Sequence, residues 1–411
     1  MTDPTRAALV RLLRDEGRRV LATLVRHTGD LQLAEDAVQD AVLRALATWP
    51  RIGVPPQPRA WLTVTARNRA VDLVRRESAR LGKEAEAVAL VDSLGLGPPA
   101  DEPPEVLRDD QLRLVFTCCH PALALETQVA LALHTLCGLS TAEVGRALLV
   151  PEATMSKRLT RAKQKIARAG IPYRVPDAPE LPDRLRGVAA TVYLLFTEGY
   201  ARPDGGSTVD EAVRLARLLH ELMPDEPSVL GLLALLLLQD SRRPARFDPD
   251  GRPVPLADQD RTRWRRPAIA EGVVLVGEGL RRTPDRPDPY VVQAAIAACH
   301  ALAPISAETD WAAVLSWYDV LLTVADTPVV RLNRAVAVGE RHGPAAALSE
   351  LDALPGLSGY PLWHATRAEL LARLDRVAEA RAAFDAALAL PLNEAQRTHV
   401  AGRRAAVCGA T

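Results

Sequence analysis

The sequence predicts an all-α protein of two to four domains. Nearly half of its 411 residues are hydrophobic but only 4% are aromatic. Ala and Leu dominate over the β-branched and aromatic residues that strands prefer,. At about 150 residues per domain, the length predicts more than one domain. The formal charge is balanced, so any nucleic-acid signal must come from local clusters of charge.

The first predicted domain covers residues 1–81. Residues 5–26 and 31–48 carry apolar side chains at helical spacing, and a Pro-rich break at 50–58 separates them from a helix at about 59–80,. Between residues 51 and 83 basic residues clearly outnumber acidic ones. We expect one compact helical unit with a basic flank.

Composition changes twice farther along the chain. Residues 82–110 are rich in Asp, Glu, Gly and Pro, which predicts an acidic, flexible linker,. Residues 111–170 form a second helical domain, and the four prolines of 171–182 predict another linker,. The remaining residues, 183–411, are expected to be helical to the end.

Residues 125–169 have the pattern of a helix-turn-helix. A first helix stops near Cys137 at Gly138, Ser140 or Thr141 caps a short second helix, and Pro151 opens a third,. An apolar stripe holds the third helix on its scaffold, and it consists of Met155, Leu159, Ala162 and Ile166. The opposite face is basic, so DNA binding is favoured over a merely solvated helix.

In such motifs the N-terminal part of the last helix enters the major groove, while basic side chains contact phosphates. The residues expected to meet base edges are Glu152, Ala153, Thr154, Ser156 and Lys157. The residues expected to meet phosphates are Arg158, Arg161 and Lys165.

The C-terminal region contains an internal repeat. The segment from Pro328 aligns with the segment from Pro361, thirty-three positions later, with coincident Arg, Ala and apolar positions. Helix-pair repeats have about this length, so the region is TPR-like. Such stacks expose a concave surface that suits a protein or peptide partner or an intramolecular one, although a purely stabilising scaffold explains the pattern too.

The helix at 58–80 presents Trp61, Asn68 and several arginines. These side chains suit stacking, base hydrogen bonding and phosphate contact, but Arg-rich solvated helices and core tryptophans are also common. On the residues alone the two interpretations are balanced.

The chain resembles a bacterial RNA polymerase sigma factor of the extracytoplasmic-function class in regions two and four. Three segments together carry this resemblance, namely the run AEDAVQDAVLRALATWP (34–50), the helix at 58–80 and the helix-turn-helix. Within that class, the chain resembles the group that carries a C-terminal TPR-like extension. The motifs that carry this resemblance are FTCCHPAL (116–123), GIPYRVP (170–176), LLFTEGY (194–200), RRPAR (242–246) and DQDRTRW (258–264).

The resemblance implies roles for particular residues. Asp36, Gln39 and Asp40 would dock on core RNA polymerase. The last helix of residues 125–169, which is the second helix of the helix-turn-helix, would read the minus-thirty-five element of promoter DNA. The acidic linker would lie in the RNA channel of the polymerase. The residues implied at the minus-ten element, where a base leaves the stack, are Arg59, Trp61, Arg67, Asn68, Arg75 and Arg76.

Other functions are disfavoured. Cys118, Cys119 and His120 invite a zinc site, but adjacent cysteines do not fit the usual ligand spacing. DQDRTRW favours an interdomain ion-pair cluster over a binding site. Nucleotide-binding, metalloprotease and serine-hydrolase motifs are lacking, so we expect neither an enzyme nor a cofactor. The five cysteines without a CxxC pair and the lack of an apolar run of about 18 residues favour a cytoplasmic protein without a membrane segment.

The sequence therefore predicts a sigma factor controlled by its C-terminal helical domain. The alternative is a conventional helix-turn-helix regulator whose helical-repeat domain senses a ligand or peptide.

Overall fold

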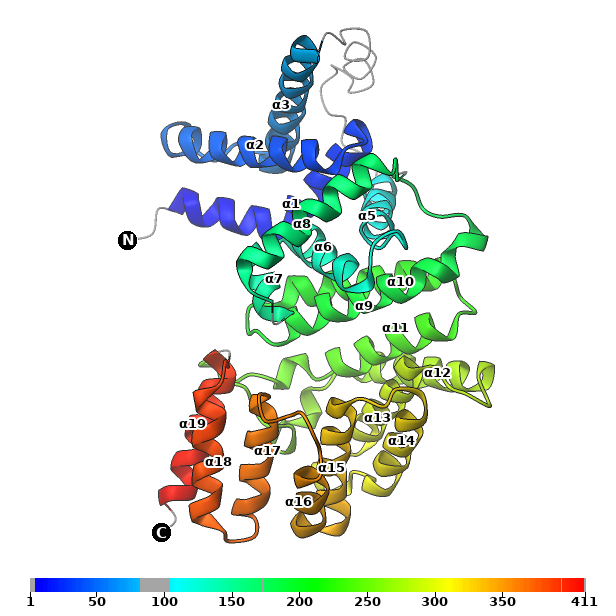
Figure 1. Cartoon of the computed structure of the whole chain (residues 1–411), viewed down its shortest axis with the longest axis vertical. Helices are drawn as coiled ribbons and strands as arrows, with labels where there is room; N and C mark the ends of the chain where they lie inside the picture. Colours follow the sequence, from blue (N-terminus) through cyan, green and yellow to red (C-terminus); the bar gives the residue numbers. More distant parts are fainter. Residues whose placement is uncertain (1–3, 82–103, 149, 172, 393, 410–411) are drawn as a thin grey trace. The chain divides into compact units, whose positions relative to one another are not determined.

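The computed structural model describes residues 4–81, 104–148, 150–171, 173–392 and 394–409 (Figure 1). Most of these residues lie in helices, and none of them belongs to a β-strand. The predicted all-α class is confirmed. The chain divides into two compact units, Met1–Leu195 and Phe196–Thr411.

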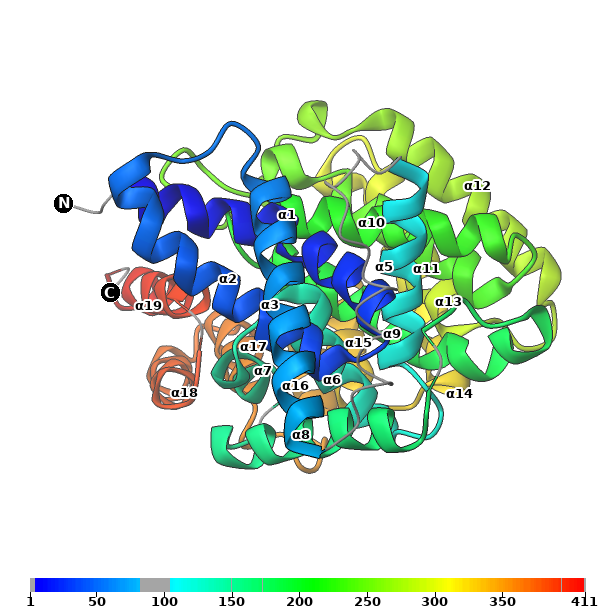
Figure 2. The same ribbon diagram turned by 90° about the horizontal axis from the view of Figure 1, so that it is seen from above.

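The first unit begins with three mutually packed helices, α1 (Pro4–Thr28), α2 (Leu31–Ile52) and α3 (Pro58–Leu81). Figure 2 shows α3 crossing α1 and α2. The buried stripe of α2 is mostly alanine, which lets neighbouring backbones approach, and comprises Ala34, Ala37, Ala41, Ala45 and Trp49. The predicted Pro-rich break is shorter than expected, because α2 continues to Ile52 and ends at Gly53, whose N–H donates to the Trp49 carbonyl at 2.9 Å.

The rest of the first unit comprises α5 (Pro104–Cys118), α6 (Leu125–Cys137), α7 (Thr141–Ala147), α8 (Glu152–Arg168), η1 (Ala178–Glu180) and the first half of α9 (Leu181–Tyr200). Helix α5 starts inside the segment predicted as the acidic linker, since proline is well tolerated in the first turn of a helix. Residues 82–103 of that segment lie outside the described residues. The predicted linker at 171–182 likewise contains η1 and the start of α9.

The second unit contains the end of α9 and then a succession of helices. They are α10 (Gly206–Leu222), α11 (Pro227–Asp240), η2 (Arg243–Ala245), η3 (Leu256–Asp258), η4 (Arg261–Arg263), α12 (Arg266–Arg282), α13 (Pro289–Leu302), η5 (Ser306–Glu308), α14 (Trp311–Val324), α15 (Pro328–His342), α16 (Pro344–Asp352), α17 (Pro361–Ala372), α18 (Val377–Ala389) and α19 (Glu394–Gly409). The apolar run at 229–238 is buried in α11, between α10, α12 and α13. Within the described ranges, no helix has the length and apolarity needed to cross a lipid bilayer.

The repeat seen in the sequence is also a structural repeat. Helices α15 and α16 pack together, as do α17 and α18 (Figure 1). Equivalent positions of the two copies are buried, namely Ala335 and Ala368, Ala347 and Ala380, and Leu351 and Phe384. An ion pair recurs at the same offset: Arg334 bonds Asp319 at 2.7 Å and Arg367 bonds Asp352 at 2.8 Å. The same side-chain contact therefore links successive helices of the array.

Candidate nucleic-acid interface

The turn before α7 has the geometry that its sequence predicts. Gly138 adopts a left-handed conformation (φ 64°) and its N–H donates to the Leu133 carbonyl, which ends α6. Ser140 and Glu143 then form a capping box. The Ser140 N–H and hydroxyl lie 2.8 and 2.7 Å from a Glu143 carboxylate oxygen, and the Glu143 N–H donates back to the Ser140 hydroxyl at 3.3 Å. The start of α7 is thus fixed by local hydrogen bonds.

The turn between α7 and α8 needs a residue without a side chain. A Cβ on Gly145 would lie 2.7 Å from the Val150 carbonyl oxygen, and the Val150 N–H donates to the Gly145 carbonyl at 2.8 Å. Pro151 precedes α8 and its carbonyl accepts from the first turn of the helix. This close approach fixes the angle at which α8 leaves the turn.

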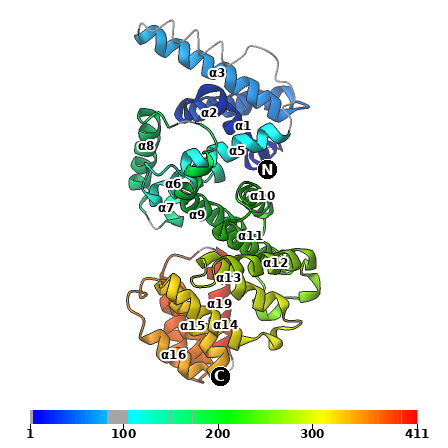
Figure 3. The same ribbon diagram turned by 90° about the vertical axis from the view of Figure 1, so that its right-hand side faces the viewer.

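Helix α8 lies at the edge of the first unit in Figure 3. Its predicted apolar stripe is fully buried and consists of Met155, Leu159, Ala162 and Ile166. All five residues predicted to meet base edges are exposed, namely Glu152, Ala153, Thr154, Ser156 and Lys157. Because they occupy the first two turns, the N-terminal end of α8 presents all five of these side chains to solvent.

The three predicted phosphate contacts differ in their surroundings. Arg161 is exposed. Arg158 is half-buried and lies 3.5 Å from the Glu126 carboxylate of α6, while the exposed Lys165 donates to the Ala122 carbonyl. Arg161 is therefore the side chain of this set with the greatest freedom to contact a phosphate.

An ion pair between α8 and α2 was not foreseen from the sequence. The Lys163 ammonium bonds the Glu35 carboxylate, and both side chains are nearly buried, with 12% and 10% of their surface exposed. The Thr135 hydroxyl lies 3.5 Å from the same carboxylate. A signal was present, since Glu35 lies beside Ala34 and Ala37 on the buried side of an amphipathic helix, but nothing in the sequence identified its partner.

The aromatic residue predicted for the minus-ten element packs against a core residue of the first unit. The Trp61 ring meets the buried Trp49 ring edge to face, with 5.4 Å between centroids, and Trp61 itself is half-buried. Arg59 is also half-buried, with its guanidinium 3.6 Å from the Glu16 carboxylate. Both residues are thus held in place at the start of α3.

The other predicted minus-ten residues follow along α3. Asn68 and Arg75 are exposed, whereas Arg67 is half-buried. The side chain of Arg76 lies outside the described part of the structure. Of the predicted minus-ten residues whose side chains are described, the Asn68 amide and the Arg75 guanidinium are the ones exposed to solvent.

Of the three residues predicted to bind polymerase, Asp36 and Gln39 are exposed on α2. Asp40, expected to be exposed as well, keeps 38% of its side-chain surface exposed but already has a partner. Asp40 is half-buried, and its carboxylate accepts a hydrogen bond from Arg69 of α3. Because α2 and α3 pack side by side, an acidic side chain at this position of α2 lies next to the basic side chains of α3.

Sequence reasoning missed apolar residues on the same face of α2. Leu43 and Leu46 are 63% and 42% exposed, and they continue the stripe of Asp36 and Gln39 at helical spacing. An apolar residue in a helix usually packs in the core. The available signal was that both leucines fall off the alanine stripe, so α2 has a second, unpartnered apolar face.

The adjacent cysteines of FTCCHPAL pack against α9. Cys118 and Cys119 are buried, and the Cys119 sulfur lies 3.4 Å from the Thr191 hydroxyl. Burial raises the pKa of the Cys119 thiol to about 12 and also raises the pKa of Cys118. His120 Nδ1 accepts the Ala122 N–H at 3.1 Å. These groups are engaged in packing and in a turn.

Tyr173 of GIPYRVP ties together two helices of the first unit. Its hydroxyl lies 3.0 Å from the Ala22 carbonyl of α1 and 2.6 Å from the Asp110 carbonyl of α5. Asp110 is fully buried and its carboxylate accepts from Arg26 at 2.9 Å. The motif thus holds α1 and α5 together within this unit.

DQDRTRW does not form the predicted ion-pair cluster. In the range that contains this motif, the structure gives no ion pair to Asp258, Asp260, Arg261 or Arg263. Asp260 instead caps η4 by accepting the Thr262 N–H at 2.9 Å, and Arg261 donates to two backbone carbonyls.

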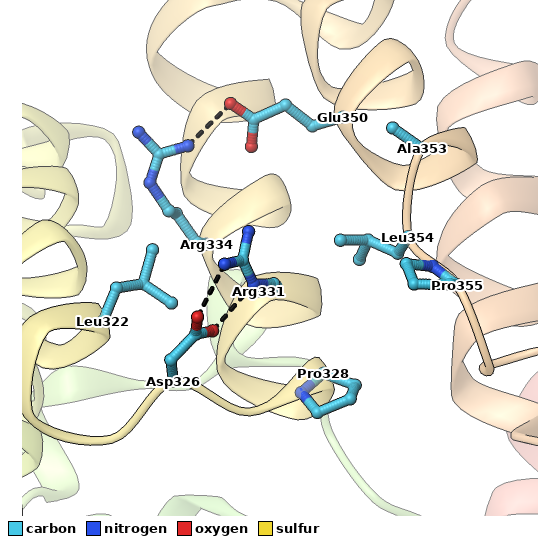
Figure 4. Close-up of a pocket in the computed structure, with 9 residues that line it drawn as sticks. All are labelled: Leu322, Asp326, Pro328, Arg331, Arg334, Glu350, Ala353, Leu354 and Pro355. Atoms are coloured by element: carbon cyan, nitrogen blue, oxygen red, sulfur yellow. Dashed lines mark hydrogen bonds and ion pairs between the residues drawn. The ribbon is translucent and has the colours of Figure 1, made fainter.

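A pocket of about 640 Å³ lies between α14, α15 and the end of α16 (Figure 4). Its charged side chains neutralise one another. Arg331 donates to both oxygens of Asp326 at 2.7 and 2.6 Å, and Arg334 donates to Glu350 at 2.6 Å. The apolar lining comprises Leu322, Pro328, Ala353, Leu354 and Pro355. With its charges matched, the pocket suits an apolar or mixed segment better than a free ion.

Three parts of the chain match known families. Residues 12–80 match sigma-70 region 2, residues 113–166 match sigma-70 region 4, and residues 184–279 match a family of unknown function, DUF6596. No solved structure gives a significant match.

Similar proteins cover either the whole chain or its N-terminal part. An uncharacterized protein of Rhizobium meliloti is 45% identical over 396 residues, which are 93% of this chain and 92% of that protein. The ECF RNA polymerase sigma factor SigL of Mycobacterium tuberculosis is 35% identical over 155 residues, 37% of this chain and 84% of SigL. SigG of the same organism, also an ECF sigma factor, is 26% identical over 262 residues, 58% of this chain and 68% of SigG. With both sigma regions in order on an exposed helix-turn-helix scaffold, the chain belongs to the ECF RNA polymerase sigma factors, and it continues into a helical C-terminal region.

Proposed function

We propose that this sigma factor acts in the cytoplasm, brings core RNA polymerase to promoters by reading the minus-thirty-five element with α8, and opens the minus-ten element with α3. We further propose that residues 183–411 control this activity. The observation that carries the proposal is the exposed N-terminal end of α8, held by a fully buried stripe, in a chain whose family initiates transcription.

For the minus-thirty-five element we assign base contacts to the exposed residues of the first turns of α8. Arg161 and, once released from their present contacts, Arg158 and Lys165 would bind phosphates. Phosphate contacts give affinity without sequence preference, so the two groups have different signatures.

Binding of the polymerase–sigma complex to promoter DNA at several salt concentrations tests this division. Arg161→Gln should weaken binding to all promoters and reduce the salt slope by about one. Lys157→Ala should change the preference among promoter sequences. Gln164→Ala, an exposed change on the same helix, is the matched control. Equal losses in all three variants would contradict the assignment.

For the minus-ten element we assign strand capture to Asn68 and Arg75, with Trp61 shaping the start of the helix. Taking a base from the stack costs a few kcal/mol, which a pocket and nearby cations must offset. Potassium permanganate reactivity of promoter thymines reports this opening. Asn68→Ala should reduce reactivity while leaving duplex binding by α8 intact.

For polymerase we assign the stripe of Asp36, Gln39, Leu43 and Leu46 on α2. Exposed leucines beside polar groups are typical of a binding surface. Leu43→Ser should weaken assembly with core polymerase without destabilising the free protein, because the side chain makes little contact with the core. Ala47→Ser, at an exposed position of the same helix, is the control.

Control by the C-terminal region is supported by the way α9 begins. This helix opens the match to the family of unknown function, yet its first half packs inside the first unit. A Cβ on Gly187 would lie 2.0 Å from the Gln128 side-chain oxygen, and Arg184 donates to the Phe116 carbonyl at 3.1 Å. The chain that leads into the extension thus starts within the first unit, and we propose that a protein segment acts on the extension at the pocket between α14 and α16.

In vitro transcription with core polymerase tests the whole proposal. A deletion should begin at Ala201 and not at residue 183, because the earlier cut removes the buried start of α9. We expect this deletion to change promoter-dependent transcription, and Gly187→Ala in the full chain to change it in the same direction. Unchanged transcription in both would refute control by the extension. No stimulated initiation by the intact chain on any promoter would refute the promoter assignments.

A further inference from the structure

Three motifs that promoter recognition does not use converge in the second unit. Tyr200 ends LLFTEGY, and Arg242 and Arg246 come from RRPAR. The Arg246 guanidinium lies 3.8 Å from the centroid of the Tyr200 ring and its Nε donates to the Tyr200 carbonyl at 2.8 Å. The Arg242 guanidinium lies 6.0 Å from the same ring. The guanidinium groups of both arginines thus lie against the ring of Tyr200.

Arg261 of DQDRTRW is the most buried of these arginines, with only 6% of its surface exposed. One terminal nitrogen donates to the carbonyls of His300 and Ala303 at 2.6 and 2.7 Å, and its guanidinium lies 4.7 Å from the Trp264 ring centroid. Its Nε and its other terminal nitrogen have no hydrogen-bond partner. Burying a guanidinium with two N–H donors that have no hydrogen-bond partner lowers the stability of the folded protein unless a ligand accepts hydrogen bonds from them.

Other donors in these motifs are idle too. The Tyr200 hydroxyl and the Trp264 indole nitrogen are buried without a partner. Both come from the residues that the arginines cover. The side-chain oxygen of Gln259, from DQDRTRW, is also buried without a partner, but the other unpartnered groups of these motifs can all donate, which is the arrangement that an oxygen-rich acceptor requires,.

The charge of the cluster is not balanced by acids. In the described part of the second unit, none of Arg242, Arg246 and Arg261 has a carboxylate within ion-pair distance. The buried carboxylate nearby, Asp240, is already shared by Arg243 at 2.5 Å and Arg265 at 2.7 Å.

The neighbouring electrostatics agree. Burial lowers the pKa of Arg246 and of Arg261, and the charge of Arg242 lowers both further. His300 is held neutral, because burial, Arg242 and Arg261 lower its pKa to about 4. Arg242 is thus close enough to act on all of these groups, and an anion between them would relieve the repulsion.

We propose that Arg242, Arg246 and Arg261 form a binding site for a phosphate group, with the Tyr200 hydroxyl and the Trp264 indole N–H as further donors. Guanidinium forks match the oxygens of phosphate in pairs. Phe196 stacks on the Tyr200 ring at 5.1 Å between centroids and Arg246 also lies against that ring. The ring is thus occupied, so the site recognises the phosphate and not a base attached to it.

Calorimetric titration of the full-length protein tests the site, at fixed ionic strength, with inorganic phosphate, with glucose 6-phosphate and with acetate. We expect saturable binding of a phosphate probe and none of acetate. Tighter binding of the ester identifies a phosphorylated metabolite as the source, and tighter binding of inorganic phosphate identifies the free ion. Loss of one charge-assisted contact in Arg242→Gln should weaken binding about tenfold or more. Arg263→Gln, which removes the same charge from an exposed position of η4, should change it less than about twofold.

The Arg242 side chain donates one hydrogen bond, to the Gln239 side chain, so its replacement should leave the fold intact, as circular dichroism can verify. If it does not, Tyr200→Phe keeps the ring and removes only the idle hydroxyl, and it should weaken binding about fivefold. No saturable binding of either phosphate probe, equal binding of acetate, or equal weakening by Arg263→Gln would overturn the proposal. None of these readouts depends on transcription, so the phosphate site and the promoter assignments fail or stand separately.

Discussion

The ion pair between Lys163 and Glu35 joins the helix proposed to read one promoter element to the domain proposed to read the other. The elements named minus ten and minus thirty-five are about 25 base pairs apart, on the order of 85 Å of duplex at about 3.4 Å per base pair. A direct contact between α8 and α2 cannot persist over that span. We therefore predict that the pair exists in the free protein and breaks on the promoter.

Lys163→Met tests this idea, because it keeps the length and apolar stem of the side chain and removes the charge. The Glu35 carboxylate would keep a single weak contact, with Thr135 at 3.5 Å. Hydrogen bonds to charged groups contribute about 1.5–3 kcal/mol, and removing one partner of a fully buried pair costs about 3–5 kcal/mol. Both side chains retain roughly a tenth of their exposure, so we expect about 2 kcal/mol, a shift of roughly thirtyfold toward separated helices.

Fluorescence energy transfer between labels at the exposed positions Arg44 and Gln164 measures the separation. The variant should show lower transfer in the free protein, and promoter binding with core polymerase should tighten because less energy is needed to separate the helices. Arg168→Met, which removes an exposed charge from the last turn of the same helix and has no assigned DNA contact, is the control. Unchanged transfer and unchanged promoter affinity in Lys163→Met would refute the reasoning.

Three further predictions follow from local geometry. Gly145→Ala should lower the free energy of unfolding of the first unit by about 1–3 kcal/mol because the new Cβ overlaps a backbone carbonyl,; Gly402→Ala, in open space, is the control, and equal stability in urea unfolding would contradict the prediction. Iodoacetamide at pH 8 should leave buried Cys119 unmodified in the native protein and modify the half-buried Cys299 slowly, because burial raises the pKa of both thiols; rapid native labelling of Cys119 in mass spectra would be inconsistent with this. Burial lowers the pKa of His300 from 6.5 to about 4, so the contribution of this residue to stability is present above about pH 6.5 and is lost as pH falls toward 4. His300→Gln should therefore remove about 2 kcal/mol of the difference in unfolding free energy between pH 7 and pH 5. Identical stability–pH profiles of the variant and the original protein would exclude this.

Patterns within one helix were the most predictable part of the structure. The spacing of Met155, Leu159, Ala162 and Ile166 defines the buried side of α8, because a helix places residues three and four apart on one face. The capping box and Gly138 were equally readable, since their hydrogen bonds lie within a few residues. Every one of these features depends on local chain geometry.

Contacts between distant segments were not predictable. Glu35 and Lys163 are 128 positions apart, and nothing in the sequence indicated that Asp40 bonds Arg69 of α3. Leu43 and Leu46 were missed for the opposite reason, since apolar residues were expected to face a core. A sequence pattern shows which residues share a face, but the three-dimensional packing decides what that face meets.

The recurring ion pairs Arg334–Asp319 and Arg367–Asp352 fix the distance between neighbouring helices of the array. Each arginine reaches back to an acid fifteen positions earlier, so the spacing of neighbouring helices is fixed by side-chain length and not by the loops. A residue inserted into the loop after α16 would leave both acids in register, whereas one inserted within α16 between Leu348 and Asp352 would turn Asp352 by about 100° and separate it from Arg367. Length variation among related arrays should accordingly be confined to loops.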